Sequence, residues 1–238
     1  MQKLYIPKKF LYTVSLLVAL TTNVMASVVV SGTRVIYQEE ESEVTVKVTN
    51  KGTKPVLIQA WLDNGDQNSS PALIKTPFVI TPPISRINGL KGQTLRISKI
   101  STSSLPKDRE SIYWLNVLEI PSMDADTASK NKLQVAFRTR IKFFYRPEGL
   151  RKDISKIMSE VEWAVEGNRL IAKNNTPFYV NLLGAEGTAG KAKTQLNMLS
   201  PFEKKVFESS KGVFKPGDII HIRYLNDYGA MNSKEVKL

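Results

Sequence analysis

A long run of alternating apolar residues constrains this chain more than any other feature. Within residues 132–147 the apolar side chains occupy every second position, with one interruption at Thr139. They are Leu133, Val135, Phe137, Ile141, Phe143 and Tyr145. A period of two predicts a β-strand with one apolar face. The strand would span about fourteen residues where about 5–6 is usual, so it could extend past its own domain and expose an edge that pairs with another chain.

The N-terminus has the features of a secretory signal peptide. Three lysines precede an apolar segment at residues 10–20, which is too short to span a bilayer. Small residues then predict cleavage after Ala26. We therefore expect residues 1–26 to be a signal peptide, and we find no later segment apolar enough to enter a membrane.

Composition excludes several kinds of chemistry. The chain has a formal net charge of +12, which falls to about +9 without residues 1–26 and favours acidic partners or anionic surfaces. It has no cysteine and one histidine, His221, so disulfides and Cys- or His-based metal sites are excluded. No nucleophile or acid–base set converges in the sequence. We expect no catalytic residues, no metal and no cofactor, and therefore no enzyme.

Short strand-like runs separated by turn residues fill the rest of the chain. In the first half they lie at residues 28–37, 43–50, 56–63, 78–80, 94–100, 111–120 and 132–146. Seven strands at this spacing predict an immunoglobulin-like sandwich, and Trp61 on the third strand fits that plan. The second half shows runs at residues 159–165, 170–174, 179–185, 194–198, 204–207, 219–225 and 235–238.

A turn at residues 147–149 follows the longest strand and predicts the domain boundary. The chain is therefore expected to be all-β, with an immunoglobulin-like domain at residues 27–147 and a second β-sandwich at residues 148–238. No long amphipathic helix is predicted.

Arg34 interrupts an apolar face. In a single strand over residues 28–37, alternation places Arg34 beside Val28, Val30 and Ile36. Two interpretations fit this strand alone. The arginine could extend to water and discourage edge pairing, or it could form an anion site, because a guanidinium binds a carboxylate with two hydrogen bonds.

Lys142 gives a weaker signal. Strict alternation places it opposite Ile141 and Phe143 and beside Arg138 and Arg140, on what would be a solvated basic face. Alternation alone does not bring Lys142 to Arg34. A bulge or the twist of the strand would have to redirect it.

Several local strings, taken in order, resemble one family. They are TRVIY (33–37), QAW (59–61), TPP (81–83), LPKDRES (105–111), NVLEIP (116–121), RIKFFYRP (140–147) and LNDYG (225–229). This pattern resembles the periplasmic chaperones of the chaperone–usher pilus pathway, the PapD-like family. The short loop at residues 122–131 resembles that of its short-loop class. The resemblance covers nearly the whole chain after Ala26 and implies two immunoglobulin-like domains arranged as an L.

The resemblance also implies roles for particular residues. Arg34 and Lys142 would hold the C-terminal carboxylate of a pilus subunit. Leu133, Val135 and Phe137 would form the donor strand that enters the groove of the subunit, a known mode of strand addition for pilus chaperones. The interdomain salt bridge would consist of Glu110, Arg146 and Asp227.

The implied partners are pilus or fimbrial subunits and an outer-membrane usher, and the implied location is the periplasm. No nucleic-acid partner is expected, because the basic residues are scattered and the chain is exported. An exposed strand edge is also compatible with self-association of the free form. The alternative function is a secreted adhesin or carbohydrate-binding module, which would favour aromatic side chains in loops, whereas the loops here are small and polar.

Overall fold

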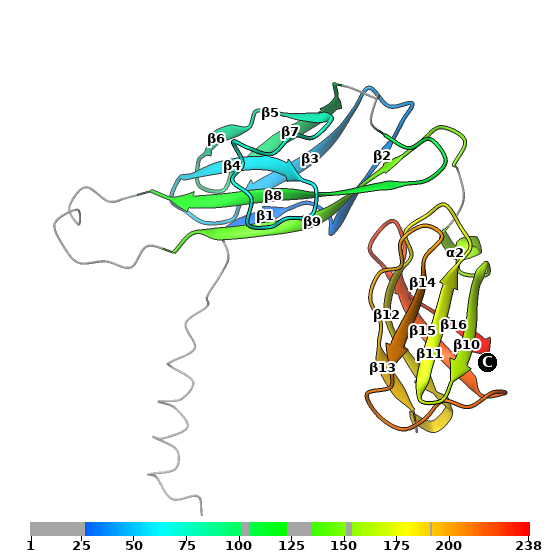
Figure 1. Ribbon diagram of the computed structural model, residues 1–238. Helices are drawn as coiled ribbons and strands as arrows, with labels where there is room; N and C mark the ends of the chain where they lie inside the picture. The colour runs from blue at the N-terminus through cyan, green and yellow to red at the C-terminus, as the bar shows by residue number, and fades with distance from the viewer. Residues whose placement is uncertain (1–26, 101–104, 123–134, 151–153, 191) are drawn as a thin grey trace, which may run out of the picture.

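The computed structural model describes residues 27–100, 105–122, 135–150, 154–190 and 192–238. The described chain forms two β-sandwiches, which lie as the two arms of an L (Figure 1). This arrangement confirms the predicted all-β fold. One core cluster runs from Val28 to Tyr145 and a second from Ile157 to Tyr224, so each sandwich buries apolar residues of its own.

The first domain packs a four-stranded sheet against a five-stranded sheet. The order of the first sheet is β1-β3-β7-β5 and that of the second is β2-β9-β8-β4-β6. The strands are β1 (Val28–Val30), β2 (Arg34–Gln38), β3 (Glu43–Asn50), β4 (Val56–Asp63), β5 (Phe78–Thr81), β6 (Ile84–Ile87), β7 (Gly92–Lys99), β8 (Ser111–Pro121) and β9 (Phe137–Arg146). Alternating apolar residues from both sheets fill the space between them, as in other sandwiches.

The predicted first strand is in fact two strands in two sheets. Gly32 has a φ of +84°, a conformation that favours glycine, and the chain crosses there from the four-stranded to the five-stranded sheet. β1 pairs with β3, whereas β2 pairs in parallel with β9. The crossing changes which residues face inward. Val35 and Tyr37 are buried in the core and Arg34 is not, so the predicted placement of Arg34 beside Val28 and Val30 is wrong.

The predicted strand plan missed β6, and it gave Trp61 a place that the structure does not support. Pro82 and Pro83 follow the end of β5, and β6 begins directly after them and pairs with β4 in the other sheet. Trp61 is not a core residue, because the positions of β4 that pack in the core are Val56, Ile58, Ala60 and Leu62. Trp61 lies on the opposite face of β4.

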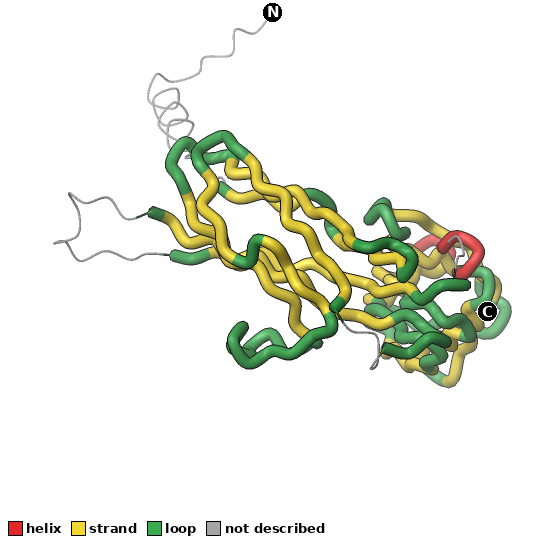
Figure 2. The backbone as a smooth tube through the Cα atoms, turned by 90° about the horizontal axis from the view of Figure 1, so that it is seen from above, coloured by secondary structure: helices red, strands yellow, loops and turns green. Residues whose placement is uncertain are grey.

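The second domain packs a three-stranded sheet, β10-β11-β14, against a four-stranded sheet, β13-β12-β15-β16. The elements are α2 (Ile154–Ile157), β10 (Val161–Glu166), β11 (Arg169–Asn174), β12 (Asn181–Gly187), the short 3₁₀ turn η2 (Thr188–Gly190), β13 (Lys193–Gln195), β14 (Lys204–Glu208), β15 (Ile219–Leu225) and β16 (Met231–Lys237). Seen from above, the strands of the first domain run toward this second domain (Figure 2).

An aromatic cluster stiffens the end of the first domain that faces the second. The Phe78 and Phe143 rings meet edge to face at a centroid distance of 4.9 Å, and Tyr37 lies 5.6 Å from Phe78. Such pairs stabilise a core beyond their area burial. Phe143 and Tyr145 belong to β9, so this cluster holds the C-terminal end of that strand firmly.

Candidate functional site

The first component of the site is the open edge of β9. β8 pairs with residues 137–145 of β9, whereas β2 pairs only with residues 142–146. Residues 137–141 therefore have a single neighbour among the described strands. An unpaired edge of this kind can accept a strand from another chain.

The apolar residues at this edge are exposed. Phe137 is 53% and Val135 48% exposed. The predicted strand over residues 132–146 begins at Phe137 in the described chain, since Val135 and Ala136 precede β9 without regular structure. Leu133, the third predicted donor residue, lies outside the described residues. An apolar strand end that its own domain leaves uncovered is suited to burial against a partner.

The second component is a pair of cations at the point where β2 begins. Arg34 and Lys142 are register partners in the parallel β2–β9 pair, so both side chains lie on the same face. No bulge is needed to bring them together, because the crossing at Gly32 turns Arg34 toward the face of Lys142. Burial lowers the pKa of Lys142, and the positive charge of Arg34 lowers it further. Burial also lowers the pKa of Arg34, against the opposing negative charge of Asp227.

These cations have few partners of their own. Lys142 Nζ donates to Asn181 Oδ1 at 2.6 Å. Arg34 Nε is buried without a hydrogen-bond partner among the described residues. Buried donors without acceptors are costly, and two adjacent positive charges raise that cost. An anion placed between them would relieve both penalties.

The third component joins the two domains. Arg146 lies at the end of β9 and donates to Glu110 at 2.7 Å and to Asp227 at 2.9 Å. Glu110 also accepts a bond of 2.8 Å from the backbone N–H of Tyr179, whose ring packs on Phe144. Burial lowers the pKa of Arg146, but the bonds and charges of Asp227 and Glu110 outweigh that effect and raise it overall. The three predicted residues thus meet; their role in fixing the domain angle stays a prediction.

One face of β9 contacts the second domain. Lys142, Phe144 and Arg146 contact Asn181, Tyr179 and Asp227 of the second domain, respectively. The intervening residues, Phe143 and Tyr145, belong to the core of the first domain. A single strand therefore presents one face to the core of the first sandwich and the other to the second domain, which follows from its period of two.

Sequence reasoning missed Asn181. This asparagine is 5% exposed and begins β12, between Val180 and Leu182, both of which are buried. A buried amide needs a partner, so a polar residue inside an apolar run was a usable signal, although it could not identify Lys142 as the partner.

The described residues hold no group of three or more His, Cys, Asp or Glu side chains that could bind a metal ion. Helices long and apolar enough to cross a membrane are absent from the same residues. The fold and these contacts define a two-domain immunoglobulin-like protein in which two half-buried cations lie along a strand that is open on one edge over residues 137–141.

Comparison with known proteins identifies its family. Residues 27–151 match the N-terminal domain of the PapD pili and flagellar-assembly chaperones, and residues 156–236 match the C-terminal domain of PapD pili-assembly chaperones. The chain is 40% identical over 220 residues to the probable fimbrial chaperone YadV of Escherichia coli, covering 89% of each chain. It is 41% identical over 208 residues to the chaperone protein MrkB of Klebsiella pneumoniae, covering 86% of this chain and 88% of MrkB.

Solved structures of similar proteins support the same family. The crystal structure of the YadV chaperone matches with a TM-score of 0.76 at 37% identity, over 90% of this chain and 100% of that one. The SafB chaperone of Salmonella enterica, solved in complex with the SafA pilin, matches with a TM-score of 0.76 at 26% identity, over 91% and 99% of the two chains. The protein belongs to the PapD-like family of pilus-assembly chaperones. Members of this family are periplasmic chaperones and not enzymes, which favours the chaperone function over the adhesin alternative.

Proposed function

We propose that this protein binds fimbrial subunits in the periplasm, completes their fold with its own strand, and delivers them to an outer-membrane usher. The observation that carries the proposal is the position of an exposed apolar strand end beside two half-buried cations. Val135 and Phe137 lead along an unpaired edge directly to Lys142 and Arg34. The complex of SafB with the SafA pilin supports a fimbrial subunit as the partner.

The apolar strand end supplies the affinity. A subunit that lacks its last strand exposes a groove of unpaired backbone groups and apolar surface. Backbone hydrogen bonds to residues 137–141 would complete its sheet, and Leu133, Val135 and Phe137 would fill the groove. Each large apolar side chain contributes about 1.5–3 kcal/mol when buried, before the cost of ordering both chains.

The cation pair supplies the alignment. Arg34 and Lys142 would bind the C-terminal carboxylate of the subunit, with charge-assisted hydrogen bonds that contribute about 1.5–3 kcal/mol each. A subunit strand that ends at Lys142 and extends back along residues 137–141 runs parallel to β9. Register matters here, because a slip of one residue would turn Val135 and Phe137 out of the groove.

Export to the periplasm requires removal of the N-terminal segment. We propose that residues 1–26 are cleaved after Ala26, on the strength of the short apolar segment and the small residues that follow it. N-terminal sequencing of the protein purified from periplasm should give Ser27 as the first residue.

The test is co-expression with a fimbrial subunit from the same organism, followed by purification of the complex from periplasm. Arg34→Ala and Lys142→Ala should each reduce the recovered complex at least tenfold, since one lost charge-assisted bond of 1.5 kcal/mol is worth about that factor. Val135→Asp should prevent capture, because a carboxylate would be buried unpaired in the groove.

Each variant has a matched control on the other sheet. Arg96→Ala removes an exposed positive charge from β7, and Val79→Asp replaces a valine of β5 that is 43% exposed, close to the 48% of Val135. Both controls should capture the subunit normally. Wild-type yields from Arg34→Ala and Lys142→Ala would refute the proposed binding of the subunit carboxylate. A normal yield from Val135→Asp would refute the proposed donor strand.

A further inference from the structure

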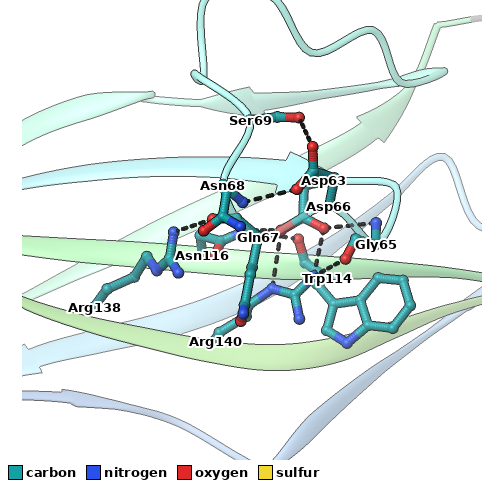
Figure 3. Close-up of polar contacts among 10 residues, drawn as sticks. All are labelled: Asp63, Gly65, Asp66, Gln67, Asn68, Ser69, Trp114, Asn116, Arg138 and Arg140. Carbon is teal, nitrogen blue, oxygen red and sulfur yellow. Dashed lines mark hydrogen bonds and ion pairs between the residues drawn. The ribbon is translucent and has the colours of Figure 1, made fainter.

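An ion pair between a buried aspartate and a partly exposed arginine lies on the face of the five-stranded sheet that also carries Lys142. Asp63 ends β4, and its side chain is 1% exposed. Arg140 of β9 reaches across to it and donates from Nη2 to Oδ1 at 2.6 Å and from Nε to Oδ2 at 3.0 Å (Figure 3). Both bonds of the guanidinium fork are made, which fixes direction as well as distance.

The carboxylate has two other donors. Asn116 Nδ2 of β8 donates to Oδ2 at 2.7 Å, and the backbone N–H of Gly65 donates to Oδ1 at 2.7 Å. Burial raises the pKa of Asp63, but the bonds from Arg140, Asn116 and Gly65 outweigh it and hold the pKa below its usual range. Asp63 therefore stays charged near neutral pH, and it links β4, β8, β9 and the start of the β4–β5 loop.

Arg140 also covers a tryptophan that is adjacent to Lys142. Its guanidinium carbon lies 4.6 Å from the centroid of the Trp114 ring. Trp114 is the register partner of Lys142 across the β8–β9 pair. Asp63 thus holds the Arg140 guanidinium over Trp114, and the charge that lowers the pKa of Lys142 is that of Arg34.

The position of Arg140 along β9 gives the pair its importance. Arg140 lies three residues after Phe137 and two before Lys142, inside the half of β9 that β8 alone supports. A strand with one backbone neighbour can twist or slide more easily than one with two. Arg138 adds a second tether, because its Nη1 donates to the carbonyl of Gln67 in the β4–β5 loop at 2.8 Å.

The loop is shaped to receive these contacts. Gly65 has a φ of +118°, and a side-chain carbon at this position would lie 3.3 Å from the Trp114 ring. Only glycine meets both conditions without strain. Its carbonyl accepts a further bond of 3.3 Å from Arg140.

We infer that Asp63 is a positioning residue for strand donation. With Arg140 it holds the open-edged half of β9 against the sheet, so that Val135 and Phe137 meet an incoming strand in one register. This role rests on the proposed function, and the two can be tested separately.

The test compares Asp63→Asn and Arg140→Lys with the wild type. The first variant keeps the shape of the side chain and removes its charge, and the second keeps the charge and loses the fork. In the free protein, hydrogen exchange of the backbone amides of residues 137–141, relative to residues 143–146 of the same strand, should rise about tenfold in both. Capture of the same fimbrial subunit, refolded from denaturant in the presence of the chaperone, should fall about tenfold.

A control separates positioning from general stability. Val48→Ala opens a cavity at a fully buried position of β3, in the other sheet, and should destabilise the domain. It should leave the exchange ratio within β9 and subunit capture unchanged. If Val48→Ala lost capture as the Asp63 variant does, stability alone would explain the effect and the inference would fall.

Two further results would overturn the inference. One is an unchanged exchange ratio in Asp63→Asn, which would show that the pair does not hold the strand. The other is a raised ratio with wild-type capture, which would show that holding the strand is irrelevant to donation. A wild type that captures no subunit would instead refute the proposed function, and this role with it.

Discussion

Residues 142–145 of β9 pair with β2 on one side and β8 on the other, and Phe143 is fully buried among aromatic rings. Residues 137–141 pair with β8 alone, and Phe137 is 53% exposed. The same alternation runs through both halves. The difference teaches that periodicity specifies a strand and its apolar face, while the neighbouring strands decide whether that face stabilises its own domain or is left for a partner.

The largest expected effect is a difference in stability between substitutions in the two halves of β9. Phe143→Ala should lower the free energy of unfolding of the first domain by about 3–5 kcal/mol, because it leaves a cavity in the core. Phe137→Ala should lower it by no more than about 0.5 kcal/mol, because the ring is exposed, yet it should weaken subunit capture. Urea unfolding of both variants measures the contrast. Equal losses of stability would mean that the N-terminal half is also part of the domain core.

A smaller effect concerns the end of the buried half. Asp227→Asn removes an ion pair with Arg146 in which the Asp227 side chain is 27% exposed, so solvent screening limits the loss to about 1 kcal/mol. Because the pair joins the domains, the variant should sample more domain orientations. Small-angle X-ray scattering should then show a broader distance distribution, whereas Lys193→Ala, at an exposed pair within the second domain, should not. An unchanged distribution in Asp227→Asn would assign the domain angle to other contacts.

The smallest effect is a pH dependence of subunit affinity that arises at Lys142, where the two halves of β9 meet. The pKa of Lys142 is lowered in the free protein, and a bound carboxylate would raise it again. Binding therefore takes up protons, and affinity falls as pH rises past the free-state pKa of Lys142 toward its bound-state pKa. The affinity for a peptide of the C-terminal residues of the subunit should drop about threefold between pH 7 and pH 10. Lys142→Arg should flatten this profile, and a steep profile in that variant would assign the proton to another group.

Much of the fold was predictable because its signals are local. β3, β4 and β15 cover the residue ranges that alternation and turn residues predict. The crossing at Gly32 was not predictable from the sequence, because apolar alternation continues through it and only the backbone conformation reveals the change of sheet. The cation pair came from family resemblance, as alternation alone placed Arg34 and Lys142 on unrelated faces.

The Asp63–Arg140 pair shows where local signals end. The two residues are 77 positions apart, and each fits an ordinary local pattern, an acid at the end of a strand and an arginine on a basic face. Their contact depends on β8 lying between β4 and β9 in the sheet. Sheet order is a property of the whole fold, and nothing near either residue encodes it.

The parallel pairing of β2 with β9 has one more consequence. β2 occupies the β9 edge from Lys142 onward. A strand of another chain that pairs with residues 137–141 on that edge would therefore have to end where β2 begins. A chaperone built in this way would recognise the position of the C-terminus of a subunit and not its amino-acid sequence. It would exclude a subunit with even a few extra C-terminal residues.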